Sequence, residues 1–205
     1  YKKINSNKNQ NIIDSNYTIM VAEVASTVNE MILGHYLIEK EENPQKKAAL
    51  INSELDKIRA TLIRQTMFAE FERDMHHDVE NGEILTNEYL SSKYMKIVKK
   101  YFGKDVVCDE LIQNEWMRIP HFYYDFYVYK YAIGLSCATK IVDDILSNKK
   151  GAKESYLNFL KTGGSMHPAD ELKVAGVDIF DDNLYSNAIK KFESYIDSFK
   201  KIKKK

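Results

Sequence analysis

The sequence is poor in the residues that interrupt or cross-link a chain. Its 205 residues include only eight glycines, three prolines and two cysteines. Cys108 and Cys137 lie far apart and form no C-x-x-C pair, so we expect reduced thiols in a cytoplasmic protein rather than a disulfide framework or a zinc ribbon. A chain of this length buries a substantial core without such cross-links.

The chain also lacks a net charge and a long apolar run. Thirty basic residues balance thirty acidic residues, so no overall positive field attracts nucleic acid or an anionic membrane. No apolar run approaches the roughly 20 residues that cross a bilayer. The polar start of the chain, residues 1–16, does not resemble a signal peptide. We therefore expect no nucleic-acid partner and no membrane partner.

Between the few glycines and prolines, apolar residues recur at helical rather than alternating spacing, which predicts an all-α protein. The expected helices cover 17–40, 44–80, 86–101, 109–117, 120–148, 152–161, 168–175 and the chain from 183 onward. The first of them should bury one apolar stripe, which consists of Val21, Val24, Val28, Ile32 and Tyr36. No internal repeat or linker is visible, so we expect a single helical domain over 1–205.

One segment, Arg118 to Tyr131, holds a histidine, an aspartate and five tyrosines around Pro120. Proline suits the first turn of a helix because the N–H that it lacks would be unpaired there. On such a helix one face would carry four of these side chains, namely His121, Tyr124, Tyr127 and Tyr131. An aromatic stripe usually packs a core. Buried phenols, however, each need a hydrogen-bond partner, so a binding face stays open as an alternative.

Glu23 is the second unusual residue, because the surrounding sequence V-A-E-V-A-S-T-V-N-E is largely apolar. A buried carboxylate needs a cation, a metal or several hydrogen-bond donors, since an unpaired buried charge is very costly. Glu30 returns to the same helix face seven residues later. An ion pair with a lysine or arginine of another helix and a role as a metal ligand are both open at this point.

The sequence contains no complete metal site or nucleophile motif. It has no H-E-x-x-H, and none of its five histidines follows a glutamate by three residues, as a di-iron bundle requires. His35 with Glu39, and His76 with Glu80, lie one turn apart and could share a metal, but such pairs are common on exposed helix faces. No glycine-rich phosphate loop or Cys/His dyad is visible. A self-sufficient zinc or iron site is therefore not expected.

Five segments together resemble the C-terminal part of oligoendopeptidase F, a thimet-oligopeptidase-like zinc metallopeptidase family. The segments are Y-T-I-M-V-A-E-V-A-S-T-V-N-E (17–30), R-Q-T-M-F-A-E-F-E (64–72), K-K-Y-F-G-K-D-V-V (99–107), R-I-P-H-F-Y-Y-D-F-Y-V-Y-K-Y-A-I-G-L-S (118–136) and Y-L-N-F-L-K-T-G-G-S (156–165). They lie in the same order and extend over nearly the whole chain. The resemblance implies a multi-helix portion of a zincin-type catalytic domain and the hydrolysis of short oligopeptides.

In that family the two histidines of H-E-x-x-H and a glutamate on a following helix bind one zinc ion. The resemblance makes Glu23 the third ligand. It also places the tyrosine-rich segment where it donates to the peptide carbonyl as this becomes an oxyanion, with His121 and Tyr131 ranked first, then Tyr124, and Tyr127 included.

The resemblance also implies what the chain lacks. The H-E-x-x-H segment is expected a few residues before residue 1, in the N-terminal remainder of the same enzyme. The segment alone is then expected to be inactive and not to hold zinc tightly. It would expose surface that the remainder covers, which offers a route to a dimer. Two alternatives are a non-catalytic helical module that binds peptides or other partners, and a structural bundle with an aromatic core.

Overall fold

The computed structural model describes residues 2–11, 13 and 15–203, and none of these residues lies in a strand, which confirms the all-α prediction. Contacts divide the chain into two compact units, one from residues 1–59 and 133–205 and the other from residues 60–132. The boundaries fall in the π-helical turn η1 (Arg59–Ile63) and in helix α6 (Tyr129–Leu146). The single domain expected over 1–205 stays a prediction.

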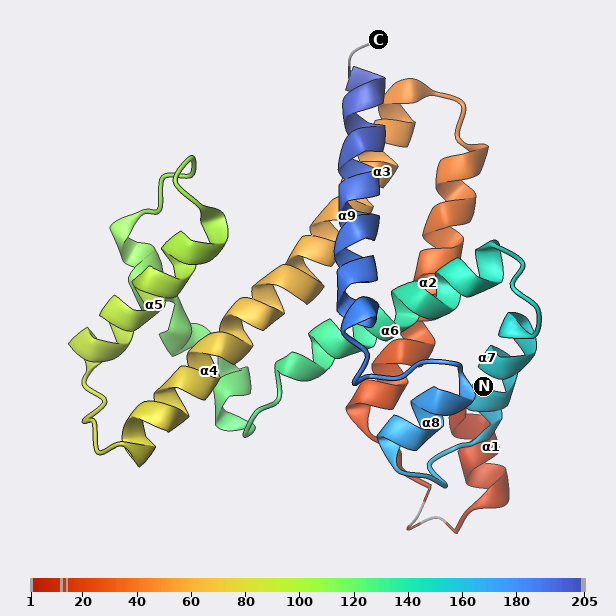
Figure 1. Ribbon diagram of the computed structural model, residues 1–205, viewed down its shortest axis with the longest axis horizontal. Helices are drawn as coiled ribbons and strands as arrows, with labels where there is room; N and C mark the ends of the chain where they lie inside the picture. The colour runs from red at the N-terminus through yellow and green to blue at the C-terminus, as the bar shows by residue number, and fades with distance from the viewer. Residues whose placement is uncertain (1, 12, 14, 204–205) are drawn as a thin grey trace. The chain divides into compact units, whose positions relative to one another are not determined.

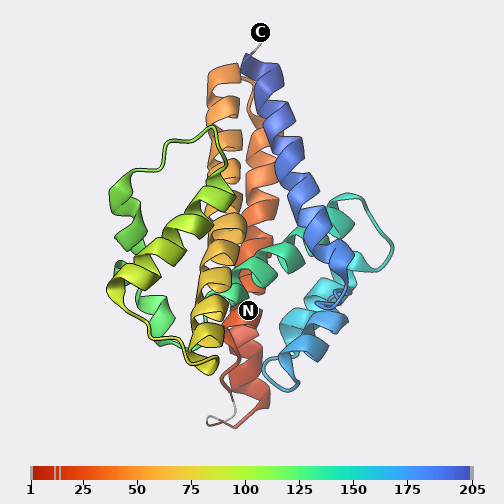
Figure 2. The ribbon, with the colours of Figure 1, turned by 60° about the vertical axis from the view of Figure 1, so that its left-hand side comes forward.

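In the first unit α2 packs against α3 and α8, and its residues Val21, Val24 and Val28 are fully buried. Helix α3 packs against α2 and α9, and Figures 1 and 2 show α3 and α9 side by side. Helix α7 packs against α8 and α1. The helices of this unit are α1 (Lys2–Asn9), α2 (Ile19–Lys40), α3 (Pro44–Ile58), most of α6, α7 (Ala152–Lys161), α8 (Pro168–Val174) and α9 (Asp182–Lys203).

The second unit is an aromatic core enclosed by short and long helices. Helix α5 packs against both α4 and η2. The rings of Phe71 and Tyr94 meet edge to face with their centroids 5.1 Å apart. Next to them the buried Glu115 accepts hydrogen bonds from Arg64 at 2.5 Å and from the Tyr94 hydroxyl at 2.7 Å. The elements of this unit are α4 (Arg64–Glu80), α5 (Asn87–Phe102), η2 (Glu110–Arg118), η3 (Pro120–Tyr123) and the start of α6.

Helix starts agree with the sequence where a local signal marks them. Pro44 occupies the first turn of α3, and the Asn43 side chain accepts from the backbone N–H groups of Gln45 and Lys46, both at 3.0 Å. Thr86 caps α5 by accepting from the Tyr89 N–H at 3.2 Å. The expected helix over 44–80 is present, with η1 as a π-helical interruption.

The expectation of a polar, non-helical lead before residue 17 is wrong, because α1 occupies Lys2–Asn9. The Lys2 side chain is buried and donates to the Phe159 carbonyl at 3.2 Å and to the Thr162 hydroxyl at 2.9 Å. Hydrogen bonds to the segment around Phe159 and Thr162, far along the chain, therefore hold α1 in place. An apolar period, on which the sequence prediction relied, is absent from it.

The predicted buried stripe of α2 extends less far than expected. Val21, Val24 and Val28 are buried, but Tyr36 is 54% exposed and the last buried residue of this helix is Met31. The segment expected as a short helix over 109–117 is the 3-10 helix η2, which begins after Asp109, whose carboxylate accepts from the Leu111 N–H at 2.7 Å. Pattern alone does not separate 3-10 from α-helical turns in so short a segment.

The long helix expected from Pro120 to about residue 148 is interrupted. The 3-10 helix η3 ends at Tyr123, and α6 begins only at Tyr129. Between them Asp125 and Phe126 adopt left-handed backbone conformations, with φ of 47° and 49°. The Phe126 N–H donates to the Glu72 carboxylate of α4 at 2.8 Å, so a tertiary hydrogen bond replaces a helical one.

Candidate functional site

The tyrosine cluster, which we define as His121, Tyr124, Tyr127 and Tyr131, forms in the second unit. The His121 ring stacks on Tyr127 with centroids 5.5 Å apart and an interplanar angle of 19°. Tyr131 meets His121 edge to face at 6.0 Å, and Tyr124 does so at 6.3 Å. The four side chains therefore gather as predicted, although an interrupted backbone and not a continuous helix brings them together.

The side chains of the tyrosine cluster are exposed or partly exposed, so solvent can reach them. Tyr124 is 62% exposed, and His121, Tyr127 and Tyr131 are partly exposed, so they are not core residues. Tyr94 and Tyr101, which lie at the core of this unit, each donate to a carboxylate. Tyr101 donates to Glu70 at 2.9 Å, and burial together with this bond raises the pKa of its hydroxyl to about 12. The cluster thus offers imidazole and phenol groups at the surface.

Glu23 lies on α2 in the first unit, between the buried Val21 and Val24, and is itself partly exposed. Burial, followed by the nearby negative charge of Glu30, raises the pKa of its carboxyl. This influence agrees with the prediction that both glutamates share one helix face. Within the described part of the chain, the Glu23 carboxylate forms no ion pair with lysine, arginine or histidine. The ion-pair explanation therefore finds no support.

Small residues let other helices approach α2 around Glu23. A Cβ added to Gly134 of α6 would lie 3.4 Å from the Glu23 Cβ, so α6 passes close to this carboxylate. Two residues further along α2, the Tyr156 hydroxyl of α7 donates to the Ala25 carbonyl at 3.1 Å. Ala22, Ala25 and Ser26 are the small residues that surround Glu23 in the sequence. Ser26 is exposed and bonds back to the Glu23 carbonyl instead.

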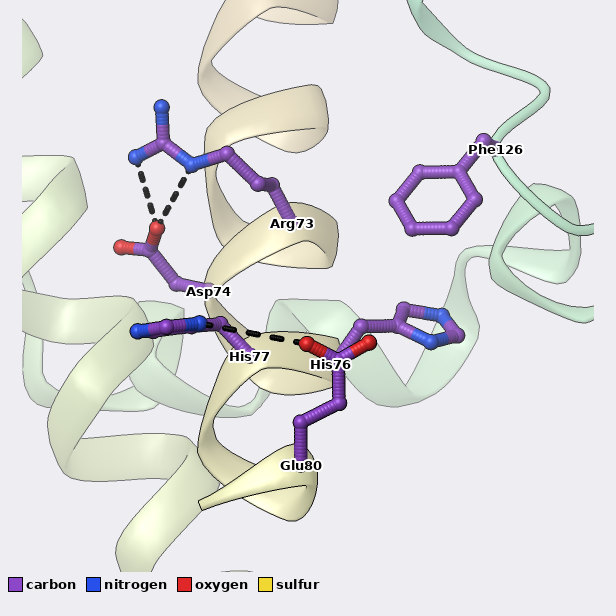
Figure 3. A pocket seen from close by; sticks show the side chains of 6 residues that line it. All are labelled: Arg73, Asp74, His76, His77, Glu80 and Phe126. Carbon is purple, nitrogen blue, oxygen red and sulfur yellow. Dashed lines mark hydrogen bonds and ion pairs between the residues drawn. The ribbon is translucent and has the colours of Figure 1, made fainter.

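Neither of the pairs considered above, His35 with Glu39 or His76 with Glu80, forms a metal site in the structure. His35 Nε2 lies 3.3 Å from Glu39 Oε1 on a largely exposed helix face. The Glu80 carboxylate pairs with His77 at 4.0 Å, while the His76 ring turns toward Phe126 in a hollow of about 490 Å³ (Figure 3). Across residues 2–11, 13 and 15–203, no three histidine, cysteine, aspartate or glutamate side chains are arranged to hold a metal ion.

Sequence reasoning missed Glu72, the carboxylate that receives the Phe126 N–H. It is 1% exposed and follows Phe71 in the segment M-F-A-E-F-E. Like Glu23, Glu72 is a carboxylate on an apolar helix face and therefore needs a partner. That signal was present in the sequence and would have singled out Glu72.

Residues 3–191 of the chain match Peptidase family M3. The chain belongs to peptidase family M3. It is 46% identical over 187 residues to Oligopeptidase PepF of Bacillus subtilis (strain 168), which covers 91% of this chain and 28% of that protein. It is 43% identical over 195 residues to the Oligoendopeptidase F homolog of Borreliella burgdorferi, which covers 95% of this chain and 33% of that protein.

Solved structures agree with the M3 assignment. Oligoendopeptidase-F from Enterococcus faecium is 43% identical and superposes with a TM-score of 0.87, covering 93% of this chain and 36% of that one. These comparisons confirm both the resemblance to oligoendopeptidase F and the helical fold. This M3 chain spans about a third of the length of the relatives that it matches. No helix within its described residues is long and apolar enough to cross a membrane.

Proposed function

We propose that this chain is the helical C-terminal portion of a zinc-dependent oligopeptidase, to which it contributes Glu23 as a metal ligand and the tyrosine cluster as oxyanion donors. The observation that carries the proposal is the gathering of imidazole and phenol groups at a partly exposed surface, with His121 stacked on Tyr127 at 5.5 Å. Membership of family M3 supports peptide hydrolysis as the reaction.

Glu23 suits a zinc ligand by its chemistry. A carboxylate oxygen is an ordinary ligand of zinc, and this one is partly buried without a cationic side chain beside it among the described residues. A zinc ion held partly by Glu23 would supply Lewis-acid chemistry towards a peptide carbonyl and a water molecule. Since Glu23 supplies one ligand only, the remaining ligands and the general base belong to the N-terminal remainder, expected to carry H-E-x-x-H.

The tyrosine cluster suits the stabilisation of a developing negative charge. Hydroxyl and imidazole N–H groups that are already in place donate to an oxyanion without reorganising at the moment of reaction. His121 contacts each of the three tyrosines of the cluster, so one ring organises the group. We rank His121 and Tyr131 first as donors, and Tyr124 after them.

The remaining parts of the proposal concern the complete protein. Its substrates are short peptides, and its place is the cytoplasm, as the absence of a disulfide between Cys108 and Cys137 favours. The chain by itself is inactive, because it holds neither the general base nor two of the ligands. Alone it would expose apolar surface and dimerise through it.

The metal assignment is tested by changing Glu23 to glutamine in the complete enzyme. We expect Glu23→Gln to lose most of its zinc in elemental analysis after dialysis, while circular dichroism shows unchanged helix content. The matched control is Glu30→Gln, which alters an exposed carboxylate of the same helix face. Full zinc occupancy in Glu23→Gln would remove this residue from the site.

The oxyanion assignment is tested on turnover. We expect His121→Ala and Tyr131→Phe to lower kcat by about 10²- to 10³-fold, the effect of losing one oxyanion donor, with a smaller change in KM. Tyr129→Phe is the control, because this exposed tyrosine lies two residues away and outside the cluster. A normal rate in His121→Ala would exclude the role proposed for it.

A second candidate function is a helical module that binds peptides without cleaving them. The partly exposed tyrosine cluster suits this candidate too, because imidazole and phenol groups at a surface can also bind a peptide without cleaving it. Mass spectrometry of the intact natural polypeptide separates the two candidates. An H-E-x-x-H segment within about ten residues upstream of Tyr1 supports the peptidase, whereas its absence from the polypeptide supports the binding module.

A further inference from the structure

Glu72 is a buried carboxylate beneath the segment that carries the tyrosine cluster. It lies on α4, its side chain is 1% exposed, and its Oε1 accepts the Phe126 N–H at 2.8 Å. Its other oxygen, Oε2, is buried and has no hydrogen-bond partner within the described residues. Burying such a group is costly. The hydrogen bond from the Phe126 N–H is therefore the contact through which this buried carboxylate is held.

The hydrogen bond falls on a strained piece of backbone. Asp125 and Phe126 both have positive φ values, 47° and 49°, which residues with a Cβ rarely adopt. Two such residues in succession persist only where surrounding contacts hold them. The bond from the Phe126 N–H to Glu72 is one of these contacts, and it joins residues 54 positions apart.

The second contact comes from the same face of α4. His76 lies one turn beyond Glu72, and its ring packs on the Phe126 ring with centroids 4.5 Å apart (Figure 3). Glu72 thus holds the backbone of Phe126, while His76 holds its side chain. Residues four apart on a helix are neighbours, so α4 presents a two-point support to this turn.

The supported turn lies inside the tyrosine cluster. Tyr124 precedes it and Tyr127 follows it, and both rings contact His121, which lies before the turn. Their own centroids are 5.8 Å apart. An extended segment through Asp125 and Phe126 would carry Tyr127 away from His121 and separate these rings. In this structure the left-handed turn, and not a continuous helix, brings the rings of Tyr124 and Tyr127 beside His121.

The charge state of Glu72 is consistent with a supporting role. Burial raises the pKa of the Glu72 carboxyl, and the negative charge of Asp125 raises it further. The hydrogen bond from the Phe126 N–H and the charges of His76 and Lys130 lower this pKa, but burial outweighs them. Protonation removes the cost of a buried charge, and the carbonyl oxygen of a neutral carboxyl still accepts the N–H. Glutamine imitates this neutral form, which makes Glu72→Gln the conservative variant.

We propose that Glu72 is a positioning residue, which holds the Asp125–Phe126 turn through the Phe126 N–H and so keeps Tyr124 and Tyr127 beside His121. The part of this inference that concerns turnover rests on the proposed peptidase function. The part that concerns the turn does not.

The test combines hydrogen–deuterium exchange with kinetics on the complete enzyme. We expect Glu72→Met, which keeps the length of the side chain without an acceptor, to speed exchange at least tenfold in the peptide 122–128 and to lower kcat by about a hundredfold, as a misplaced catalytic group does. KM should stay within about threefold. Glu72→Gln should keep both quantities near the wild-type values, because its carbonyl still accepts the N–H.

The matched control is Glu70→Gln, which changes a carboxylate of the same helix that bonds to Lys100 and Tyr101 of α5. It should leave exchange in 122–128 and kcat unchanged. Unchanged exchange in Glu72→Met would overturn the proposal, and so would a loosened turn with normal kcat. If Glu72→Met exchanges rapidly throughout the protein, Glu72→Asp replaces it, because the shorter carboxylate keeps the charge but does not reach Phe126. Faster exchange in Glu72→Asp that is confined to the peptide 122–128 supports the proposal. Exchange in that peptide as slow as in the wild type overturns it.

Failure of the peptidase function has a different signature. A wild-type enzyme that cleaves no peptide, or a His121→Ala variant with normal kcat, would contradict the proposed function. Exchange in the peptide 122–128 of Glu72→Met would still decide whether Glu72 holds the turn.

Discussion

The Lys2 ammonium lies 3.5 Å from Glu171 Oε1, and the two side chains are only 3% and 1% exposed. At this distance the contact is an ion pair rather than a hydrogen bond. Burial lowers the pKa of Lys2 and raises that of Glu171, so desolvation outweighs the mutual attraction for both. The pair joins α1 to α8 within the first unit.

We predict that Lys2→Met destabilises the protein by about 3–5 kcal/mol, because it leaves Glu171 buried without its cation. The double variant Lys2→Met/Glu171→Leu should recover most of this loss, since an apolar pair has no charge to desolvate. Urea unfolding followed by circular dichroism measures both. A double variant as unstable as Lys2→Met would show that packing of Lys2, and not its charge, matters.

The carboxylate of Glu115 should make the stability depend on acid pH. Burial alone would raise its pKa, but hydrogen bonds from Tyr94 and Arg64 outweigh burial and lower it. A carboxyl with a lowered pKa in the folded state stabilises the protein above its unfolded pKa, about 4.3. This contribution is lost as the pH falls from that value through the folded pKa.

We therefore predict that the difference in unfolding free energy between wild type and Glu115→Gln is large at pH 7 and shrinks steadily below about pH 4.3. Denaturant titrations at pH 7 and pH 3 measure it. Glu110→Gln is the control, because Glu110 is an exposed residue of the same 3-10 helix. A difference that is constant with pH would contradict the assignment.

Two glycines are needed for different reasons, and substitutions should separate them. A Cβ on Gly164 would lie 2.7 Å from the Asn16 carbonyl oxygen, whereas Gly82 has open space around it but a φ of 85°. We expect Gly164→Ala to cost about 1–3 kcal/mol through the clash and Gly82→Ala about 1–2 kcal/mol through backbone strain. Thermal unfolding measures both.

The asparagine variants sharpen this comparison. Asparagine tolerates the left-handed region better than alanine, so Gly82→Asn should regain part of the stability that Gly82→Ala loses. Gly164→Asn should be no better than Gly164→Ala, because its Cβ meets the same carbonyl oxygen. Equal recovery at both positions would contradict the distinction.

The two thiols should differ in reactivity. Cys137 is fully buried, and burial raises its pKa to about 12, whereas Cys108 is partly exposed. Because the thiolate is the reactive form, we predict that a disulfide reagent modifies Cys108 alone in the folded protein and both cysteines in denaturant. The absorbance of the thiol that the reagent releases gives the number of modified cysteines. Folded Cys108→Ser should release none, and a rapid release from it would contradict the burial of Cys137.

The features that could be predicted from the sequence are those that neighbouring residues determine. Asn43 and Pro44 mark the start of α3, and Thr86 marks that of α5, because capping bonds join residues two or three apart. The resemblance located the tyrosine cluster and Glu23. It did not indicate that the backbone between His121 and Tyr131 leaves the helix.

The features that escaped prediction depend on partners far along the chain. Helix α1 has no apolar period, and Lys2 is held by residues more than 150 positions away. Glu72 meets Phe126 across 54 positions. Neither pairing leaves a periodic signal, because periodicity records only the geometry of a residue's own helix.

The sequence by itself determined that this chain is helical, where most of its helices begin and end, and to which peptidase family it belongs. The helices and their ends follow from hydrogen bonds and side-chain spacing within a few residues. The family follows from sequence segments that are long enough to be characteristic of it. Only the tertiary structure decided that Asp125 and Phe126 form a left-handed turn and that Lys2 and Glu171 share a buried site. The physical reason is that buried polar groups must be satisfied by whatever packs against them, and packing is decided by the whole fold.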